Sequence, residues 1–321
     1  MPALMVLAQR KWLDDTGCAA VETQGAVLGF SSSLISVSVP SPFVTLQYLL
    51  PKQLLTALAG RFAAAELGAV TTAAIKWFAR RYGVNMAEAA ESNLQRYTSF
   101  NAFFTRPLQV GARPLADAEL LCPVDGAISV VGALDGDRLV QAKGHHYTTT
   151  ALVGGDAKMA ERFVGGSFAT IYLSPRDYHR IHMPCGGRLV RMIHVPGDLF
   201  SVNPTTVAGV PRLFARNERV VCLFEGAHGP FVMVLVGATI VGSMATVWHG
   251  VVNPPRPGVL RSWDYPTDGV GAIHLAKGAE MGRFLLGSTV VMLFPAPGVA
   301  FSRDWVPARP VRMGEAMGSI S

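Results

Sequence analysis

Apolar residues follow two different spacings along the chain, and the change between them falls near residue 113. Between residues 43 and 95, apolar side chains recur every three or four positions, within 54–65 and again within 70–82. That spacing places them on one face of a helix. From residue 113 to about residue 310, short apolar runs alternate with Gly, Pro and Asp turns, as β-strands do. The pattern predicts helices first and a β-rich region after them.

Several runs in the second region have the length and composition of strands. Residues 219–224 and 231–236 flank the turn-rich segment 225–230, and we expect a hairpin there. Further strands are expected at residues 168–173, 188–195 and 284–294.

These patterns divide the chain into three parts. Residues 1–41 hold Ser-rich and Pro-rich stretches and no assignable element, residues 42–112 form a helical region, and residues 113–321 form a β-rich domain. Helices that are segregated from strands in this way indicate an α+β fold.

The composition favours a folded protein that meets a membrane surface. Half of the 321 residues are apolar, 16% are charged, and the formal net charge is +6. The cations of the helical region face one nearby anion, Glu66; they are Lys52, Arg61, Lys76, Arg80 and Arg81. Cations beside Leu, Trp and Phe are typical of a helix in the headgroup plane, although a helix docked on a core shows the same pattern. The chain has no Lys/Arg-rich run, so we expect no nucleic-acid partner.

The chain has no uninterrupted apolar run of about 18 residues, so we expect no transmembrane helix. The four cysteines are scattered, with no pair at metal-ligand spacing, and we expect neither a disulfide framework nor a metal site. A reducing compartment, the cytoplasm or its membrane face, fits this usage of cysteine.

The Gly287–Ser288 peptide, within Leu286–Thr289, allows a specific reaction. The serine hydroxyl can attack the carbonyl before its own nitrogen, and glycine leaves that carbonyl open to approach. This attack turns the amide into an ester. Loss of the serine α-proton then expels the ester as a carboxylate and leaves a dehydroalanine, which tautomerises and is hydrolysed to a pyruvoyl group. The alternative is a glycine bulge in an ordinary strand.

A second group of reactive side chains lies in the segment 172–184, where His179 and His182 stand three residues apart between two prolines. A neutral imidazole is suited to removing a hydroxyl proton near pH 7, so His182 is a candidate base and His179 a second acid or base. Asp125, in an Asp-Gly pair, is either a turn residue or a carboxylate that orients a histidine.

In this order, the blocks of the chain from about residue 46 to residue 312 resemble the phosphatidylserine decarboxylases of the bacterial, short-chain type. The blocks that carry the resemblance are 100–108, 123–126, 141–145, 172–184, 196–203, 213–219, 236–243, 277–282 and 286–289.

The resemblance implies roles for particular residues. Asp125, His182 and Ser288 would form a self-cleavage triad, in which His182 deprotonates Ser288 and Asp125 orients His182. Cleavage between Gly287 and Ser288 would convert Ser288 into the pyruvoyl cofactor. The amine of phosphatidylserine would then form a Schiff base with the pyruvoyl ketone, and the substrate would lose carbon dioxide. His179 would transfer a proton to the substrate Cα, and hydrolysis would free phosphatidylethanolamine.

The resemblance also implies partners and a location. The expected partners are the phosphatidylserine substrate, an anionic membrane surface, the cleaved small chain 288–321 and a second processed pair in a homodimer. We expect a peripheral protein on the cytoplasmic face of the cell membrane, with the helical region 42–112 in contact with lipid and the β-rich domain 113–321 catalytic.

Two other functions fit parts of the chain. Asp125, His182 and Ser288 follow the chain order of a subtilisin-type serine hydrolase, and residues 242–245 echo its nucleophile segment. His182 lacks the Gly-rich context of that class, and no G-x-S-x-G elbow occurs. A membrane-binding protein without enzymatic activity would keep the helical region but would stay a single chain.

Overall fold

A computed structural model describes residues 42–239, 243–254, 256, 258–285 and 289–320. The chain separates into two compact units, Met1–Leu49 and Leu50–Ser321. Helix α2 (Pro42–Leu49) is the described element of the first unit, and every other described element belongs to the second.

The second unit begins with helices. They are α3 (Lys52–Ala64), α4 (Ala69–Tyr82), the 3-10 helix η1 (Leu94–Arg96) and α5 (Phe100–Phe104). Helix α4 ends at Gly83, whose φ of 65° is left-handed and suits glycine. Phe78 of α4 packs edge-on against Phe100, with ring centroids 5.1 Å apart, and so fixes α4 to α5.

Part of the helical prediction is confirmed, since α3 and α4 cover most of residues 54–82. Within the described residues, no single helix is long and apolar enough to cross a membrane; α3 and α4 reach that length and composition only together, bent by 112° at their junction.

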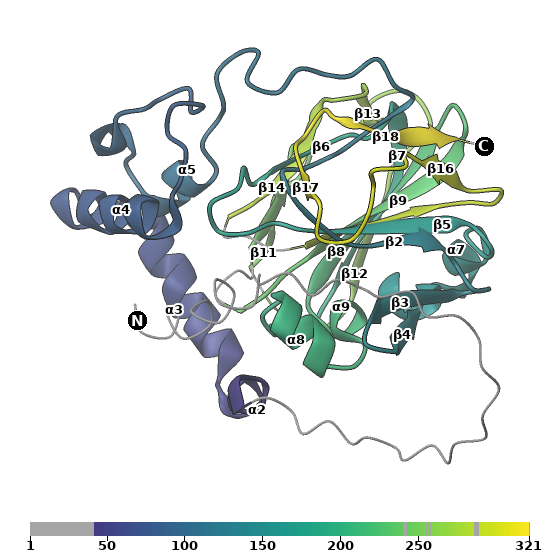
Figure 1. The fold of residues 1–321 in the computed structure, drawn as a ribbon, viewed down its shortest axis with the longest axis horizontal. Helices are drawn as coiled ribbons and strands as arrows, with labels where there is room; N and C mark the ends of the chain where they lie inside the picture. Colours follow the sequence, from purple (N-terminus) through teal and green to yellow (C-terminus); the bar gives the residue numbers. More distant parts are fainter. Residues whose placement is uncertain (1–41, 240–242, 255, 257, 286–288, 321) are drawn as a thin grey trace, which may run out of the picture. The chain divides into compact units, whose positions relative to one another are not determined.

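Strands are the main regular elements in the rest of this unit (Figure 1). The largest sheet has nine strands and is antiparallel, in the order β12-β7-β8-β9-β15-β5-β2-β17, with β13 also paired to β7. Its strands are β2 (Gly126–Ala133), β5 (Ser167–Tyr172), β7 (Gly187–Val195), β8 (Arg219–Gly226), β9 (Gly229–Val236), β12 (Arg261–Asp264), β13 (His274–Leu275), β15 (Thr289–Phe294) and β17 (Pro310–Val311). The hairpin predicted around 225–230 is confirmed as β8–β9.

Three smaller sheets complete the strands. A four-stranded sheet has the order β11-β10-β14-β6, a three-stranded sheet the order β1-β18-β16, and β3 pairs with β4. Their strands are β1 (Leu120–Leu121), β3 (Arg138–Ala142), β4 (His145–Thr148), β6 (Arg180–His182), β10 (Met244–Thr246), β11 (Gly250–Asn253), β14 (Glu280–Phe284), β16 (Val299–Phe301) and β18 (Ala316–Ile320).

The main core lies between the large sheet and the small ones. Phe224, Met233 and Met292 of the large sheet share one buried cluster with Phe284 and Met317 of the small sheets. Every residue of β15 is buried, so this strand is covered on both faces, and after Thr289 its sequence is a continuous apolar run without alternation.

Two sequence expectations need correction. The single strand expected at 284–294 is wrong: β14 ends at Phe284 in the four-stranded sheet, and β15 begins at Thr289 in the large one. Short helices also interrupt the β-rich region, at α6 (Thr149–Leu152), α7 (Ala157–Glu161), α8 (Pro204–Gly209) and α9 (Leu213–Arg216). Three of them begin at a Thr, Asp or Asn cap, a local signal that apolar spacing does not register.

Candidate functional site

Asp125 lies between β1 and β2, and its carboxylate is held on several sides. Arg113 donates from Nε to both carboxylate oxygens, at 2.9 and 3.1 Å. The backbone N–H of Met313, between β17 and β18, donates to Oδ1 at 2.9 Å. The Asp125 carboxylate is therefore fixed in one orientation by charge-assisted hydrogen bonds.

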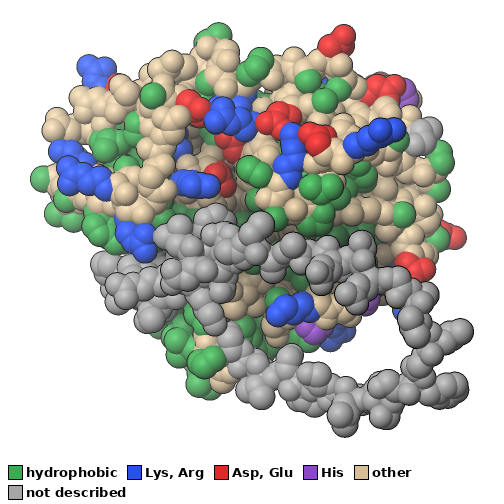
Figure 2. Space-filling view, in the orientation of Figure 1, with side chains coloured by type: hydrophobic (Ala, Val, Ile, Leu, Met, Phe, Trp, Pro, Cys, Tyr) green, Lys and Arg blue, Asp and Glu red, His purple; other side chains and the backbone are tan. Residues whose placement is uncertain are grey.

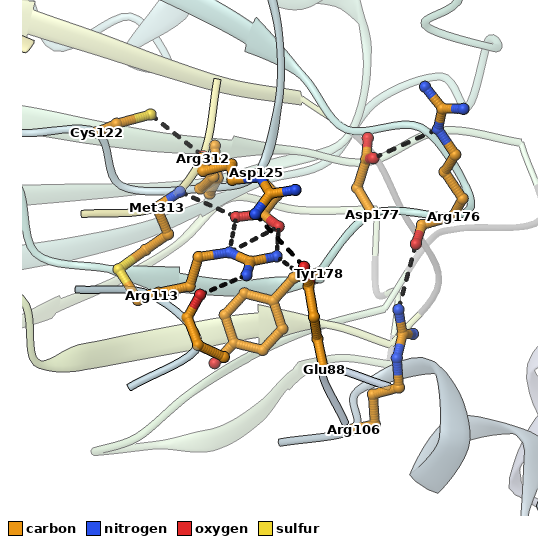
Figure 3. Close-up of polar contacts among 12 residues, drawn as sticks. Glu88, Arg106, Arg113, Cys122, Asp125, Arg176, Asp177, Tyr178, Arg312 and Met313 are labelled. Atoms are coloured by element: carbon orange, nitrogen blue, oxygen red, sulfur yellow. Dashed lines mark hydrogen bonds and ion pairs between the residues drawn. The ribbon is translucent and has the colours of Figure 1, made fainter. Parts of the chain in front are cut away.

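Arg113 connects Asp125 to a second carboxylate (Figure 3). Its Nη2 donates to Glu88 Oε2 at 2.7 Å, and Arg312 lies 3.4 Å from the other oxygen of Glu88. Burial acts to lower the pKa of Arg113, but its hydrogen bonds to Asp125 and Glu88 outweigh burial and raise that pKa. The guanidinium thus remains charged between two carboxylates.

His182 is the last residue of β6, and both of its ring nitrogens have partners. Nδ1 lies 2.8 Å from the carbonyl oxygen of Gly278, and Nε2 lies 3.1 Å from the hydroxyl of Tyr178. A carbonyl oxygen only accepts, so Nδ1 carries the proton. Burial lowers the pKa of His182, and the hydrogen bond that its Nδ1–H donates to the Gly278 carbonyl opposes this shift. The ring is therefore neutral at pH 7, with Nε2 as an acceptor and potential base.

Asp125 and His182 have different hydrogen-bond partners within the described part of the chain. Gly278 occupies the position at Nδ1 that the expected triad gives to Asp125. The negative charge of Asp125 still acts on His182 from a longer range, in the direction that raises its pKa. The orienting role of Asp125 remains a prediction, and the geometry favours an effect through its charge.

His179 precedes β6 and is fully buried, with its ring stacked on Phe104 at a centroid distance of 4.0 Å. The carbonyls of Ser174 and Pro175 lie close enough to raise its pKa slightly, but neither ring nitrogen has a hydrogen bond of normal geometry in the described structure. Burial, followed by the nearby positive charge of Arg106, lowers the pKa of His179 to about 3. An uncharged imidazole is thus held in a fully buried site.

Arg106 follows α5 and is 3% exposed. Its Nη2 donates to the carbonyl of Arg176 at 3.2 Å, and its guanidinium lies 5.5 Å from the centroid of the Phe103 ring. Nε and Nη1 have no partner in the described residues. Burial lowers the pKa of Arg106 because the charged form is desolvated.

The expected cleavage site, Gly287 and Ser288, lies outside the described residues, and its two flanks are placed. On one side, the N–H of Phe284 donates to the carbonyl of His179 at 3.0 Å, and that of Leu285 to Ser243 at 3.0 Å. On the other side, Thr289 pairs with Tyr172 of β5 and with Val236 of β9. The chain therefore approaches the site beside His179 and leaves it in the centre of the large sheet.

Sequence reasoning missed Glu88, Arg113 and Arg106. Arg106 stands inside one of the recognised blocks, 100–108, but nothing local distinguishes it from a surface arginine. Glu88 and Arg113 are 25 residues apart and meet only in the folded chain. A local pattern could not have identified them as partners of Asp125.

The fold and these side chains define a β-rich enzyme domain with a neutral, partly buried histidine at the end of β6 and a firmly held carboxylate between β1 and β2. The profile of the phosphatidylserine decarboxylase family matches residues 100–319, and a second profile, described as PSD, matches residues 42–83. The chain belongs to the phosphatidylserine decarboxylase family.

Curated relatives agree over most of the chain. A phosphatidylserine decarboxylase proenzyme of Variovorax paradoxus is 70% identical over 275 residues, which are 86% of this chain and 96% of the relative. The proenzyme of Dechloromonas aromatica is 68% identical over 273 residues, with 85% and 96% of the two chains covered.

Proposed function

We propose that this chain is made as a proenzyme, cuts itself between Gly287 and Ser288, and decarboxylates phosphatidylserine to phosphatidylethanolamine. The observation that carries the proposal is the course of β14, which pairs with His182 at Glu280 and ends beside His179 at Phe284. The strand leads the chain past both histidines immediately before the Gly-Ser peptide. Membership of the family supports the same reaction.

For self-cleavage, His182 acts as the base toward the hydroxyl of Ser288. Its neutral ring has a proton fixed on Nδ1 by Gly278, so Nε2 is free to take a proton once Tyr178 releases it. The charge of Asp125 favours the protonated ring that forms in this step, because opposite charges attract across a low-dielectric site.

The pyruvoyl group formed from Ser288 supplies a ketone that condenses with the substrate amine and accepts the electrons released as carbon dioxide leaves. The surroundings fit such a group, since His179 provides, beside the end of β14, two buried ring nitrogens that have no hydrogen bond of normal geometry within the described residues. His179 is the residue that moves the proton to the substrate carbon. The positive charge of Arg106 lowers the pKa of His179. An anionic lipid headgroup bound beside the His179 ring would oppose this charge and raise the pKa of His179.

Intact mass spectrometry under denaturing conditions tests this proposal. We expect two chains, 1–287 and 288–321, the smaller beginning with a pyruvoyl group instead of serine. Ser288→Ala is expected to remain a single chain and to release no carbon dioxide from phosphatidylserine, because no hydroxyl remains to attack. A cleaved and active Ser288→Ala protein would overturn the proposal. Ser302→Ala, in the loop after β16, is the matched control and should be cleaved normally.

The contacts of β15 support the proposal that the small chain stays bound after cleavage. β15 is hydrogen-bonded to β5 on one side and to β9 on the other, and β18 pairs with β1. All of these partners come from the larger chain. We propose further that processed pairs form a homodimer, which light scattering on the cleaved protein measures directly.

We also propose that α3 and α4 hold the protein peripherally on the cytoplasmic face of the cell membrane. Large apolar side chains on them are 42% to 59% exposed: Leu54, Leu58, Phe62, Val70 and Trp77. At the left of Figure 2, Lys and Arg side chains lie among apolar ones where Figure 1 places α4. Burying apolar side chains in lipid while cations meet anionic headgroups favours this arrangement.

Co-sedimentation with vesicles tests this placement. The double variant Leu58→Asp, Trp77→Asp is expected to bind vesicles containing anionic lipid about tenfold or more weakly. Each change removes apolar surface that the lipid would bury and adds a negative charge that the anionic headgroups repel. The control is Val270→Asp, at a position 104% exposed in the loop before β13. Equal binding of both variants would assign α3 and α4 to another role.

A further inference from the structure

The partners of the Asp125 carboxylate form a connected cluster that self-cleavage alone does not explain. Side-chain exposure is 10% for Asp125, 7% for Arg113 and 25% for Glu88, so the chain of contacts runs from the interior toward the surface. Arg113 reaches Asp125 through two nitrogens and Glu88 through one of them. A buried arginine that is fully bonded to carboxylates is rigid, because its planar fork fixes each partner.

The cluster is built from four parts of the chain (Figure 3). Glu88 follows α4, Arg113 lies between α5 and β1, and Asp125 lies between β1 and β2. Met313 and Arg312 lie beyond the expected cleavage site and touch Asp125 and Glu88. The cluster therefore joins the helical segment to both of the chains that self-cleavage produces.

The arrangement of charges indicates that Glu88 balances the positive charge of Arg113. Arg113 alone would cancel the charge of Asp125 and so weaken its attraction for a protonated His182. Glu88 binds the opposite side of Arg113 and returns one negative charge to the cluster, while Arg312 is 60% exposed and acts mainly through solvent.

We propose that Arg113 and Glu88 are positioning residues for self-cleavage, Arg113 by holding the Asp125 carboxylate in place and Glu88 by balancing the charge of Arg113. The inference rests on the proposed role of Asp125 in that reaction. It adds a relay of three side chains, Glu88–Arg113–Asp125, behind His182. The proposed action of Arg113 and Glu88 runs through Asp125.

The rate of self-cleavage tests the relay, followed on gels after synthesis in a cell-free system. Arg113→Ala is expected to slow cleavage by about tenfold or more, since a small displacement of a catalytic carboxylate costs up to about a hundredfold. Millimolar guanidinium chloride should restore part of the rate, whereas urea, which has a similar shape but no charge, should not. The cleavage rate of Arg113→Lys should fall between the rates of Arg113→Ala and of the unaltered protein.

Glu88→Gln is expected to slow cleavage about threefold to tenfold, in proportion to the loss of one partly screened charge. Its matched control is Glu91→Gln, in the same segment, where Glu91 pairs with the exposed Arg96 at 3.4 Å. That variant should cleave within about twofold of the unaltered protein, because surface ion pairs contribute little.

Asp125→Asn separates failure of the relay from failure of the proposed role of Asp125. If Asp125→Asn is slow and Arg113→Ala cleaves at the normal rate, the relay is wrong and the role of Asp125 stands. If Asp125→Asn cleaves normally, both are wrong. If Arg113→Ala does not fold, equal rates for Glu88→Gln and Glu91→Gln overturn the relay, and a selective loss in Glu88→Gln supports it.

Discussion

The site contains two buried arginines whose surroundings are opposite. Arg113 donates to two carboxylates and to a backbone carbonyl, whereas two of the guanidinium nitrogens of Arg106 have no partner among the described residues. Beside Arg106, His179 likewise lacks partners for its ring nitrogens. A satisfied buried charge rigidifies its neighbours, while an unsatisfied polar group costs about 1–3 kcal/mol or more.

This difference separates two tasks. The hydrogen bonds of the Arg113 cluster are made to other groups of the protein. Such a cluster is suited to holding the Asp125 carboxylate in a fixed position. The groups around Arg106 and His179 keep donors and acceptors unused in a dry place, which is typical of a site that acts on a substrate. Self-cleavage should therefore depend on the first group, and turnover of phosphatidylserine on the second.

The largest effect should come from His179→Gln. We expect self-cleavage within about twofold of normal and decarboxylation slowed about a thousandfold, the range for loss of a group that transfers a proton. Mass spectrometry gives the first quantity, and carbon dioxide release by the processed protein gives the second. His146→Gln, on the exposed side of β4, is the control and should alter neither.

Loss of both activities in His179→Gln would contradict the division of tasks. It would place His179 in self-cleavage together with His182, three residues away. Normal turnover would instead remove His179 from the reaction, and its buried, unpartnered ring would then need a structural explanation.

A smaller effect should separate the two arginines in stability. Arg113→Met leaves the buried Asp125 without its cation and leaves Glu88 only the exposed Arg312, and we expect a loss of about 3 kcal/mol in the free energy of unfolding. Arg106→Met removes a cation two of whose nitrogens have no partner among the described residues and which pairs with no carboxylate there, and a loss under about 1 kcal/mol is expected. Urea titration measures both, in a Ser288→Ala background so that each protein is one chain. Equal losses would show that the two sites are held in the same way.

The sequence predicted the parts of this site that reside in local chemistry. The pair His179 and His182, bounded by prolines, is recognisable without a structure, and so is the Gly287–Ser288 peptide. Apolar spacing likewise predicted the β8–β9 hairpin and the helices α3 and α4, because each of them is built from neighbouring residues.

What the sequence could not predict depends on contacts between distant residues. Glu88, Arg113 and Met313 come from three separate segments and meet only at Asp125. The single strand expected at 284–294 failed for a related reason, since Phe284 is the last residue of β14 and residues 289–294 form β15, and these two strands belong to different sheets. Periodicity reports which face of a strand is apolar and not which partner covers it.

The smallest effect concerns pH and tests whether His179 is as desolvated as its surroundings indicate. Its pKa is about 3 in the folded protein, against 6.5 in the unfolded chain, so the unfolded state takes up the proton first as pH falls. The contribution of the neutral ring to stability is complete above pH 6.5 and is lost between pH 6.5 and pH 3. In the Ser288→Ala background, lowering the pH from about 7 to about 5.5 should therefore destabilise the protein by about 1 kcal/mol more than its His179→Gln derivative. Parallel curves of stability against pH for the two proteins would mean that the His179 ring reaches solvent or has a hydrogen-bond partner. The description of the groups around Arg106 and His179 as desolvated and unsatisfied would then be wrong.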